Sequence, residues 1–186
     1  MNTNTDPDFQ MLAALSSSLE GDYAEGEEQW AGSPFAWIKK RSSRQIGAIG
    51  EQLVAGYLAS KGFDVTRSPD SEADRLVNKT RVEIKYSSLW ETGSYKFQQL
   101  RDQNYQFAIC LGISPFSAHC WVLPKSAIME RWGNELPHQH GGKKGSDTVW
   151  LQVTPGDEPP WLKSFGGPLA SVSNLVAKYS GRPPLA

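Results

Sequence analysis

Long apolar runs are missing from this 186-residue sequence, and none approaches the roughly 18 consecutive apolar residues that a membrane-spanning helix needs. The N-terminal stretch also has no basic segment followed by an apolar core, which is the pattern of a secretion signal. We therefore expect a cytoplasmic protein that has no membrane partner.

Cysteine and histidine are scarce, with two and three residues respectively. Cys110 and Cys120 both lie in apolar stretches, which is typical of small core residues rather than of a disulfide framework. His138 and His140 lie in a loop without a nearby cysteine, and His119 belongs to a predicted core strand. We therefore expect no zinc site.

Basic residues are absent from residues 1–38, which contain seven acids and so carry a charge of −7. Residues 39–186 hold 13 acidic and 19 basic residues, a balance of +6, although the net charge of the whole chain is −1. We predict an acidic leader over 1–38, disordered or partly helical, followed by a basic domain over 39–186. Such a domain suits a polyanionic partner, although ordinary surface charge can give the same composition.

The clearest helix is predicted to start at Ser42 or Ser43, either of which can cap it, and to end at Gly62. Its apolar residues recur at helical spacing and form one stripe. They are Ile46, Ile49, Leu53, Val54, Tyr57 and Leu58. Gly47 and Gly50 lie within this stripe, so the helix can approach its neighbour closely.

Several other segments have the composition and the flanking turn residues of strands or of short helices. The predicted strands are 63–67, 74–77, 80–87, 105–113, 118–124 and 148–153. Short helices are predicted over 96–103, 125–133 and 169–180. This order indicates an α/β domain with a central mixed β-sheet flanked by helices.

The segment "TRVEIKYSS" carries Glu83 and Lys85 between apolar neighbours, and burying such charges is costly unless they are paired or bind something. If Asn78 and Lys79 form a two-residue turn, Asp74 lies directly across from Glu83, whereas a three-residue loop would offset the two carboxylates. Opposed residues have Cβ atoms about 4.5 to 5.5 Å apart, so a cation is needed between two carboxylates. Lys85 points to the same face as Glu83, because strand periodicity is two.

Another carboxylate comes from the long helix, where Glu51 lies at the border of the apolar stripe. From there it can reach the rim of the sheet, and an ordinary solvent-exposed glutamate is the alternative. Carboxylates with one lysine and no converging histidine or cysteine suit Mg²⁺ or Mn²⁺. Together with a water and a nearby lysine, such a cation can hydrolyse a phosphodiester.

Asp74, eight intervening residues and then Glu83-Ile84-Lys85, after a helix that carries Glu51, resemble the PD-(D/E)XK nuclease superfamily, which has the restriction-endonuclease-like fold. The resemblance covers roughly residues 43–125. It implies that Asp74 and Glu83 hold the metal together with the carbonyl of Ile84. It also implies that Lys85 serves the attacking water, and that Glu51 matches a helical acid that some members use for a second metal.

Two alternatives bear on this interpretation. A literal Pro-Asp pair occurs at Pro69-Asp70, which makes Asp70 a rival to Asp74, although the hairpin pairing favours Asp74. Moreover, a strand with a solvent-exposed Glu/Lys pair would show the same alternation of charged residues.

Basic, amide and hydroxyl side chains near these residues are candidate DNA contacts, because such groups bind phosphates and base edges. They are Lys39, Lys40, Arg41, Arg44, Ser87, Gln98, Gln99, Arg101, Lys143 and Lys144. The alternative for each of them is an ordinary solvated surface residue.

The sequence therefore predicts an endonuclease of the restriction or defence type, which hydrolyses DNA phosphodiester bonds with Mg²⁺ and for which Mn²⁺ can substitute. We expect a homodimer or a subunit of a larger DNA-processing assembly. One alternative is a structure-selective nuclease of the Holliday-junction-resolvase kind. Another is a catalytically silent subunit that binds nucleic acid.

Overall fold

A computed structural model describes residues 7–23, 28–138 and 147–181 of the chain. In this part of the chain, none of the helices combines the length and the apolar character that crossing a membrane requires.

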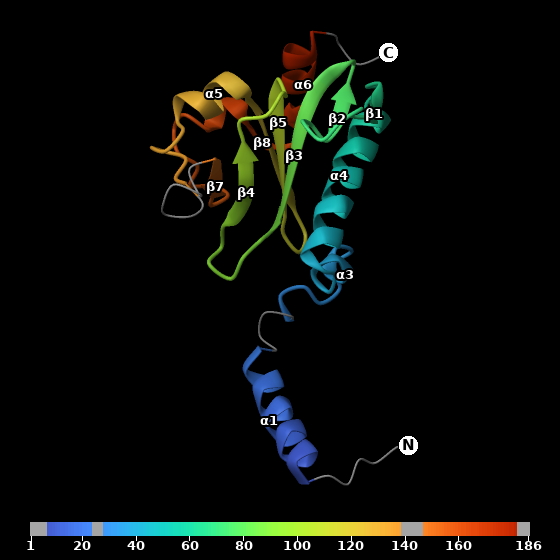
Figure 1. The fold of residues 1–186 in the computed structure, drawn as a ribbon, viewed down its shortest axis with the longest axis vertical. Helices are drawn as coiled ribbons and strands as arrows, with labels where there is room; N and C mark the ends of the chain where they lie inside the picture. Colours follow the sequence, from blue (N-terminus) through green and yellow to red (C-terminus); the bar gives the residue numbers. More distant parts are fainter. Residues whose placement is uncertain (1–6, 24–27, 139–146, 182–186) are drawn as a thin grey trace.

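The centre of the protein is a six-stranded sheet with the strand order β1-β2-β3-β5-β6-β8 (Figure 1). β3 and β5 run parallel, and every other neighbouring pair in this sheet is antiparallel. The strands are β1 (Val65–Arg67), β2 (Arg75–Val77), β3 (Thr80–Ser88), β5 (Phe107–Ile113), β6 (Ala118–Pro124) and β8 (Gly166–Pro168). The predicted α/β fold with a central mixed sheet is confirmed.

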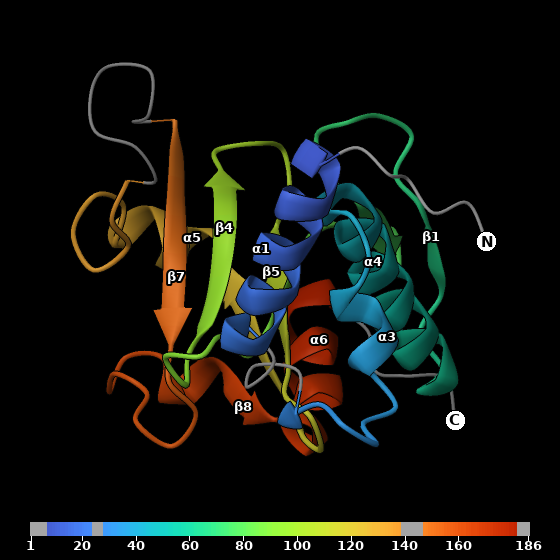
Figure 2. The same cartoon turned by 90° about the horizontal axis from the view of Figure 1, so that it is seen from below.

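Different elements cover the two faces of this sheet, and each face has its own apolar core (Figures 1 and 2). Helices α4 (Ser43–Ser60) and α6 (Val172–Ser180) pack on one face. A two-stranded sheet of β4 (Tyr95–Arg101) and β7 (Thr148–Val153), together with α5 (Lys125–Glu130), packs on the other. Short 3₁₀ helices, η1 (Lys163–Phe165) and η2 (Leu169–Ser171), flank β8.

Helix α4 begins where its sequence predicts. The Ser42 side chain accepts a hydrogen bond from the backbone N–H of Gln45, and the Gln45 side chain accepts one from the N–H of Ser42, which makes a capping box. Gly50 packs directly against β3, since a Cβ atom at this position would lie only 2.3 Å from the Cβ of Tyr86. Gly47 has no such contact, because a Cβ there would have no neighbour within 4 Å. Of the two glycines expected to allow close packing, only Gly50 does so.

The hairpin that joins β2 to β3 has the predicted two-residue turn. Asn78 and Lys79 have φ values of 50° and 70°, and Val77 pairs with Thr80. β2 pairs only with Thr80–Val82, whereas β3 continues to Ser88. None of the described strands pairs with the later part of β3 on the β2 side, so this edge of the strand is open.

The prediction of a helix over 96–103 is wrong, because most of this segment forms strand β4. The pairing of β4 with β7 is interrupted between Phe97 and Leu100, which face Leu151 and Val149. One extra residue of β4 therefore bulges out of the ladder. The bulge sets two buried apolar residues three positions apart, a spacing that is also typical of a helix.

The acidic N-terminal region divides in two. Helix α1 (Pro7–Tyr23) extends away from the sheet and its covering helices, and Phe9, Met11, Leu12 and Leu15 on it are exposed (Figure 1). Short helix α3 (Ala36–Lys39) and the residues before it instead pack on the domain, where Trp30 and Ile38 are buried.

Candidate active site

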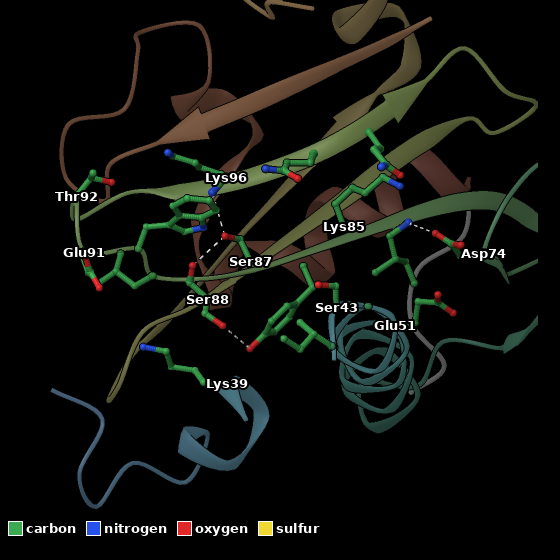
Figure 3. A pocket seen from close by; sticks show the side chains of 18 residues that line it. Lys39, Ser43, Glu51, Asp74, Lys85, Ser87, Ser88, Glu91, Thr92 and Lys96 are labelled. Atoms are coloured by element: carbon green, nitrogen blue, oxygen red, sulfur yellow. Dashed lines mark hydrogen bonds between the residues drawn. The ribbon is translucent and has the colours of Figure 1, made fainter. Parts of the chain in front are cut away.

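A cleft of about 750 Å³ lies along the open edge of β3, between α4 on one side and β4 on the other (Figure 3). Glu51, Asp74 and Lys85 lie toward one end of this cleft. Glu91 and Thr92, in the loop after β3, lie toward the other end. The cleft thus contains three of the four predicted catalytic side chains.

Asp74 is fixed to β3 just beyond the last paired residue of β2. Its backbone N–H donates to the carbonyl of Val82 at 3.0 Å, and its Oδ2 accepts a hydrogen bond from the N–H of Ile84 at 2.7 Å. The Asp74 carboxylate thus accepts the hydrogen bond that a backbone carbonyl would accept if β2 were longer. This arrangement places Asp74 beside Glu83, as the predicted hairpin requires.

Glu83 and Lys85 form an ion pair on the face of the sheet that carries β4. Glu83 is 5 % exposed, and its Oε1 lies 2.6 Å from Nζ of Lys85. Burial raises the pKa of Glu83, the Lys85 ammonium opposes this rise, and the negative charge of Asp74 adds to it. Two carboxylates, Asp74 and Glu83, therefore lie close together with one ammonium group, an arrangement that a bound cation would stabilise.

Glu51 approaches this site from α4. Its Oε2 lies 3.2 Å from the guanidinium of Arg75, the first residue of β2. Burial and the nearby charge of Asp74 raise the pKa of Glu51, whereas Arg75 lowers it. The contact of Gly50 with Tyr86 holds this turn of α4 against β3, and this explains why Glu51 reaches the rim of the sheet.

Asp70, the rival of Asp74, is used elsewhere. Its two carboxylate oxygens accept hydrogen bonds from the guanidinium of Arg81 at 2.7 and 2.6 Å. Hydrogen bonds from Arg81 lower the pKa of Asp70 to about 2. Asp70 is not among the residues that line the cleft, so the geometry favours Asp74.

The donor atoms near Asp74 are carboxylate and carbonyl oxygens, which are the ligands that hard cations prefer. Because the N–H and C=O of a strand residue point to the same edge, the Ile84 carbonyl is on the side where Asp74 lies. Within residues 7–23, 28–138 and 147–181, no three His, Cys, Asp or Glu side chains gather to hold a metal ion. Two carboxylates, Asp74 and Glu83, still fit Mg²⁺, which keeps several waters when one or two carboxylates bind it. The structure does not place Glu51 in the same ligand cluster.

The comparisons with known proteins give a likeness of fold. No protein-family model matches the sequence. No curated protein matches it either. The solved structure of a bacterial homing endonuclease, I-Ssp6803I, superimposes with a TM-score of 0.51 over 75 % of this chain and 95 % of that one. The fold is similar to that of a homing endonuclease. Sequence identity is 16 %, so the likeness concerns the fold alone and membership of the PD-(D/E)XK superfamily stays a prediction.

The structure separates the predicted DNA contacts into groups. The predicted contacts that line the cleft are Lys39, Ser87, Gln98 and Gln99. Arg101 lines a second hollow, of about 410 Å³, with Asp102 and Gln103. Lys40, Arg41 and Arg44 are exposed near the start of α4 but do not line the cleft. Lys143 and Lys144 lie outside the described residues.

Ser87 has a structural role that the sequence does not reveal. Its side chain is buried, and its hydroxyl accepts a hydrogen bond from the N–H of Lys96 and donates one to the carbonyl of Ser88. The hydrogen bond from Lys96 ties β4 to β3. We therefore do not expect this hydroxyl to contact DNA.

Sequence reasoning missed Lys96, which lines the cleft from β4. Its Nζ lies 4.0 Å from the ring centroid of Trp90 and 5.8 Å from that of Trp150, so two cation–π contacts hold it in place. The alternation of buried Tyr95 and Phe97 with Lys96 is the period of a strand, and this signal could have identified it.

Proposed function

We propose that this protein is an endonuclease that hydrolyses DNA phosphodiester bonds with Mg²⁺, for which Mn²⁺ can substitute. The observation that carries the proposal is the placement of Asp74 beside the buried Glu83–Lys85 pair, at the floor of an open cleft. The similarity of the fold to that of a homing endonuclease supports it.

In this proposal the acidic end of the cleft binds the cation and prepares a water molecule. Asp74 and Glu83 would hold the ion, together with the carbonyl of Ile84. Once bound, the ion would polarise the phosphate and lower the pKa of a bound water. The ion pair with Glu83 keeps the Lys85 ammonium at the cleft floor, where it can orient that water and stabilise charge developing on phosphorus.

The other cleft residues would hold the DNA. Lys39 and Lys96 place positive charge on opposite walls of the cleft, one from α3 and one from β4. Such charges bind the phosphate backbone whatever the sequence. The charge of Asp74 acts on both Glu51 and Glu83, and the ion pair of Glu51 with Arg75 limits this repulsion.

For the biological role, we propose restriction or defence, with the chain acting as a homodimer or as a subunit of a larger DNA-processing assembly. Cutting both strands of a duplex at one site needs two catalytic centres, which two copies of the site around Asp74 would supply.

The deciding experiment measures cleavage of plasmid and phage DNA in Mg²⁺ or Mn²⁺. The variants are Glu83→Gln and Lys85→Met, which keep the side-chain shape, with Glu130→Gln and Lys61→Met as matched controls outside the cleft. We expect Glu83→Gln and Lys85→Met to lose cleavage while they keep a cooperative thermal unfolding transition. The controls should cut like the wild type.

Other outcomes point to other functions. Equal cleavage by all five proteins would mean that Glu83 and Lys85 are not catalytic. Two symmetric cuts in a four-way junction, with linear duplex spared, would indicate a structure-selective nuclease. Salt-dependent DNA binding without any cleavage would indicate a catalytically silent subunit.

A further inference from the structure

The bulge in β4 lies in the wall of the cleft. Gln99, inside the bulge, has a φ of 57°, which residues other than glycine adopt rarely and at a cost on the order of 1 kcal/mol. Bulges of this kind occur beside active sites, where they redirect a side chain.

The effect of the bulge is to bring two neighbouring glutamines to one surface. In a regular strand, successive side chains point to opposite faces. In β4, however, Gln98 and Gln99 are both exposed and both line the cleft, while Phe97 and Leu100 on either side are buried. Without the extra residue, one of the two amides would point into the apolar core.

These amides lie close to the proposed catalytic residues. After the loop that follows β3, β4 runs back alongside β3 (Figure 1), and the N–H of Lys96 donates to Oγ of Ser87 at 2.9 Å. Gln98 and Gln99 line the same cleft as Lys85, which lies two residues before Ser87 on β3. The glutamine pair therefore shares the cleft with the proposed catalytic residues Asp74 and Lys85.

The chemistry of the pair differs from that of the lysines around it. A glutamine amide has no charge to match a phosphate, but it offers one acceptor and two donors in a plane. This arrangement matches the N6 and N7 edge of adenine in the major groove, which is wide enough to admit a two-stranded β-ribbon such as β4–β7. Lys96, held against Trp90, supplies positive charge for the adjacent phosphate.

We propose that Gln98 and Gln99 read base edges in the major groove of duplex DNA, within about two base pairs of the cut, and prefer adenine. This inference rests on the proposed function and assigns it a source of sequence preference.

The test uses a duplex library with randomised sequence, which is cleaved and then sequenced at the cut ends. Gln98→Ala removes one amide, and Gln99→Gly removes the other while allowing the positive φ. Gln52→Ala, an exposed glutamine of α4 outside the cleft, is the matched control. We expect the wild type and the control to favour adenine near the cut by on the order of tenfold, and each cleft variant to lose most of this ratio.

A wild type without base preference near the cut would overturn the inference and leave the nuclease in place. The same is true if both cleft variants keep the full preference. If the wild type cuts nothing, the proposed function fails instead. In that case, selecting the same library by filter binding without divalent cations tests the adenine preference separately from cleavage. Loss of the preference in both variants would support the inference, and its absence from the wild type would overturn it.

Discussion

Asp70 and Asp74 are four residues apart and both precede β3, yet their environments give them different roles. Asp70 binds Arg81 at the surface, whereas Asp74 binds the backbone of β3 inside the cleft. We predict that Asp74→Asn abolishes cleavage and that Asp70→Asn leaves it at the wild-type level. Measuring both rates on one plasmid substrate distinguishes the two aspartates, and the reverse result would make Asp70 the metal ligand.

Comparing the wild type with Asp70→Asn should also show how the stabilisation by the Asp70–Arg81 ion pair depends on pH. Because the pKa of Asp70 in the folded protein is lowered from 3.8 to about 2, ionised Asp70 stabilises the fold above pH 3.8. This contribution is lost as the pH falls through about 2. Urea unfolding should therefore show a small deficit for Asp70→Asn at neutral pH, which shrinks below pH 3.8. A deficit that does not change with pH would argue against the pair.

The local features of the helices, strands and turns at the site were predictable from the sequence, whereas the pairing of strands far apart in the sequence was not. The turn at Asn78 and Lys79 follows from local backbone preferences, and it sets the register that brings Asp74 beside Glu83. The strand β4 was missed because its bulge spaces Phe97 and Leu100 like residues of a helix. Its partner, β7, follows some fifty residues later, and no short-range pattern shows such pairing.

Helix α4 illustrates the same limit within one element. The sequence places Gly47 and Gly50 on one stripe but does not reveal which of them touches the sheet. In the structure, Gly50 meets Tyr86 while Gly47 lines the cleft, so a close contact depends on the position of a partner from another segment.

Replacing glycines of α4 by alanine should change the stability of the protein in opposite directions at different positions. Gly47→Ala and Gly56→Ala should each stabilise the protein by roughly 0.5–1 kcal/mol, because both positions have open space and glycine weakens a helix. Gly50→Ala should destabilise it by about 1–3 kcal/mol, because the added Cβ overlaps Tyr86. Urea unfolding of the three variants measures these differences, and stabilisation by Gly50→Ala would show that α4 does not pack this closely.

The same series separates stability from function. A large side chain at position 47 would enter the cleft, whereas position 56 is exposed on the same helix outside it. Gly47→Leu should therefore weaken DNA binding and cleavage, with Gly56→Leu as the matched control. Equal activity of the two variants would mean that DNA does not occupy this part of the cleft.

The net charge of −1 for the whole molecule hides an uneven distribution of charge between the two ends of the sequence. Residues 1–27 contain six acids and no base, so the rest of the chain carries +5. The boundary after residue 27 preserves Trp30 and Ile38, which are buried in the domain. The described residues of α1 that lie before this boundary include exposed apolar side chains and extend away from the sheet.

We predict that a chain without residues 1–27 keeps its melting temperature and binds duplex DNA more tightly at low salt. In this account residues 1–27 weaken DNA binding through long-range repulsion, and salt screens such repulsion beyond about 10 Å at 0.1 M. The affinities of the shortened and full-length chains should therefore converge as salt rises. Fluorescence anisotropy with a labelled duplex across a salt series measures both curves.

A full-length variant with the six acids of residues 1–27 replaced by Asn or Gln is the matched control for this experiment. If charge alone matters, it should bind DNA like the shortened chain. Equal affinity of the shortened and wild-type chains at low salt would contradict the prediction. A third outcome is that the shortened chain binds DNA more tightly even at high salt, whereas the charge-neutral variant binds as weakly as the wild type. This result would mean that residues 1–27 themselves cover the cleft and compete with DNA for it.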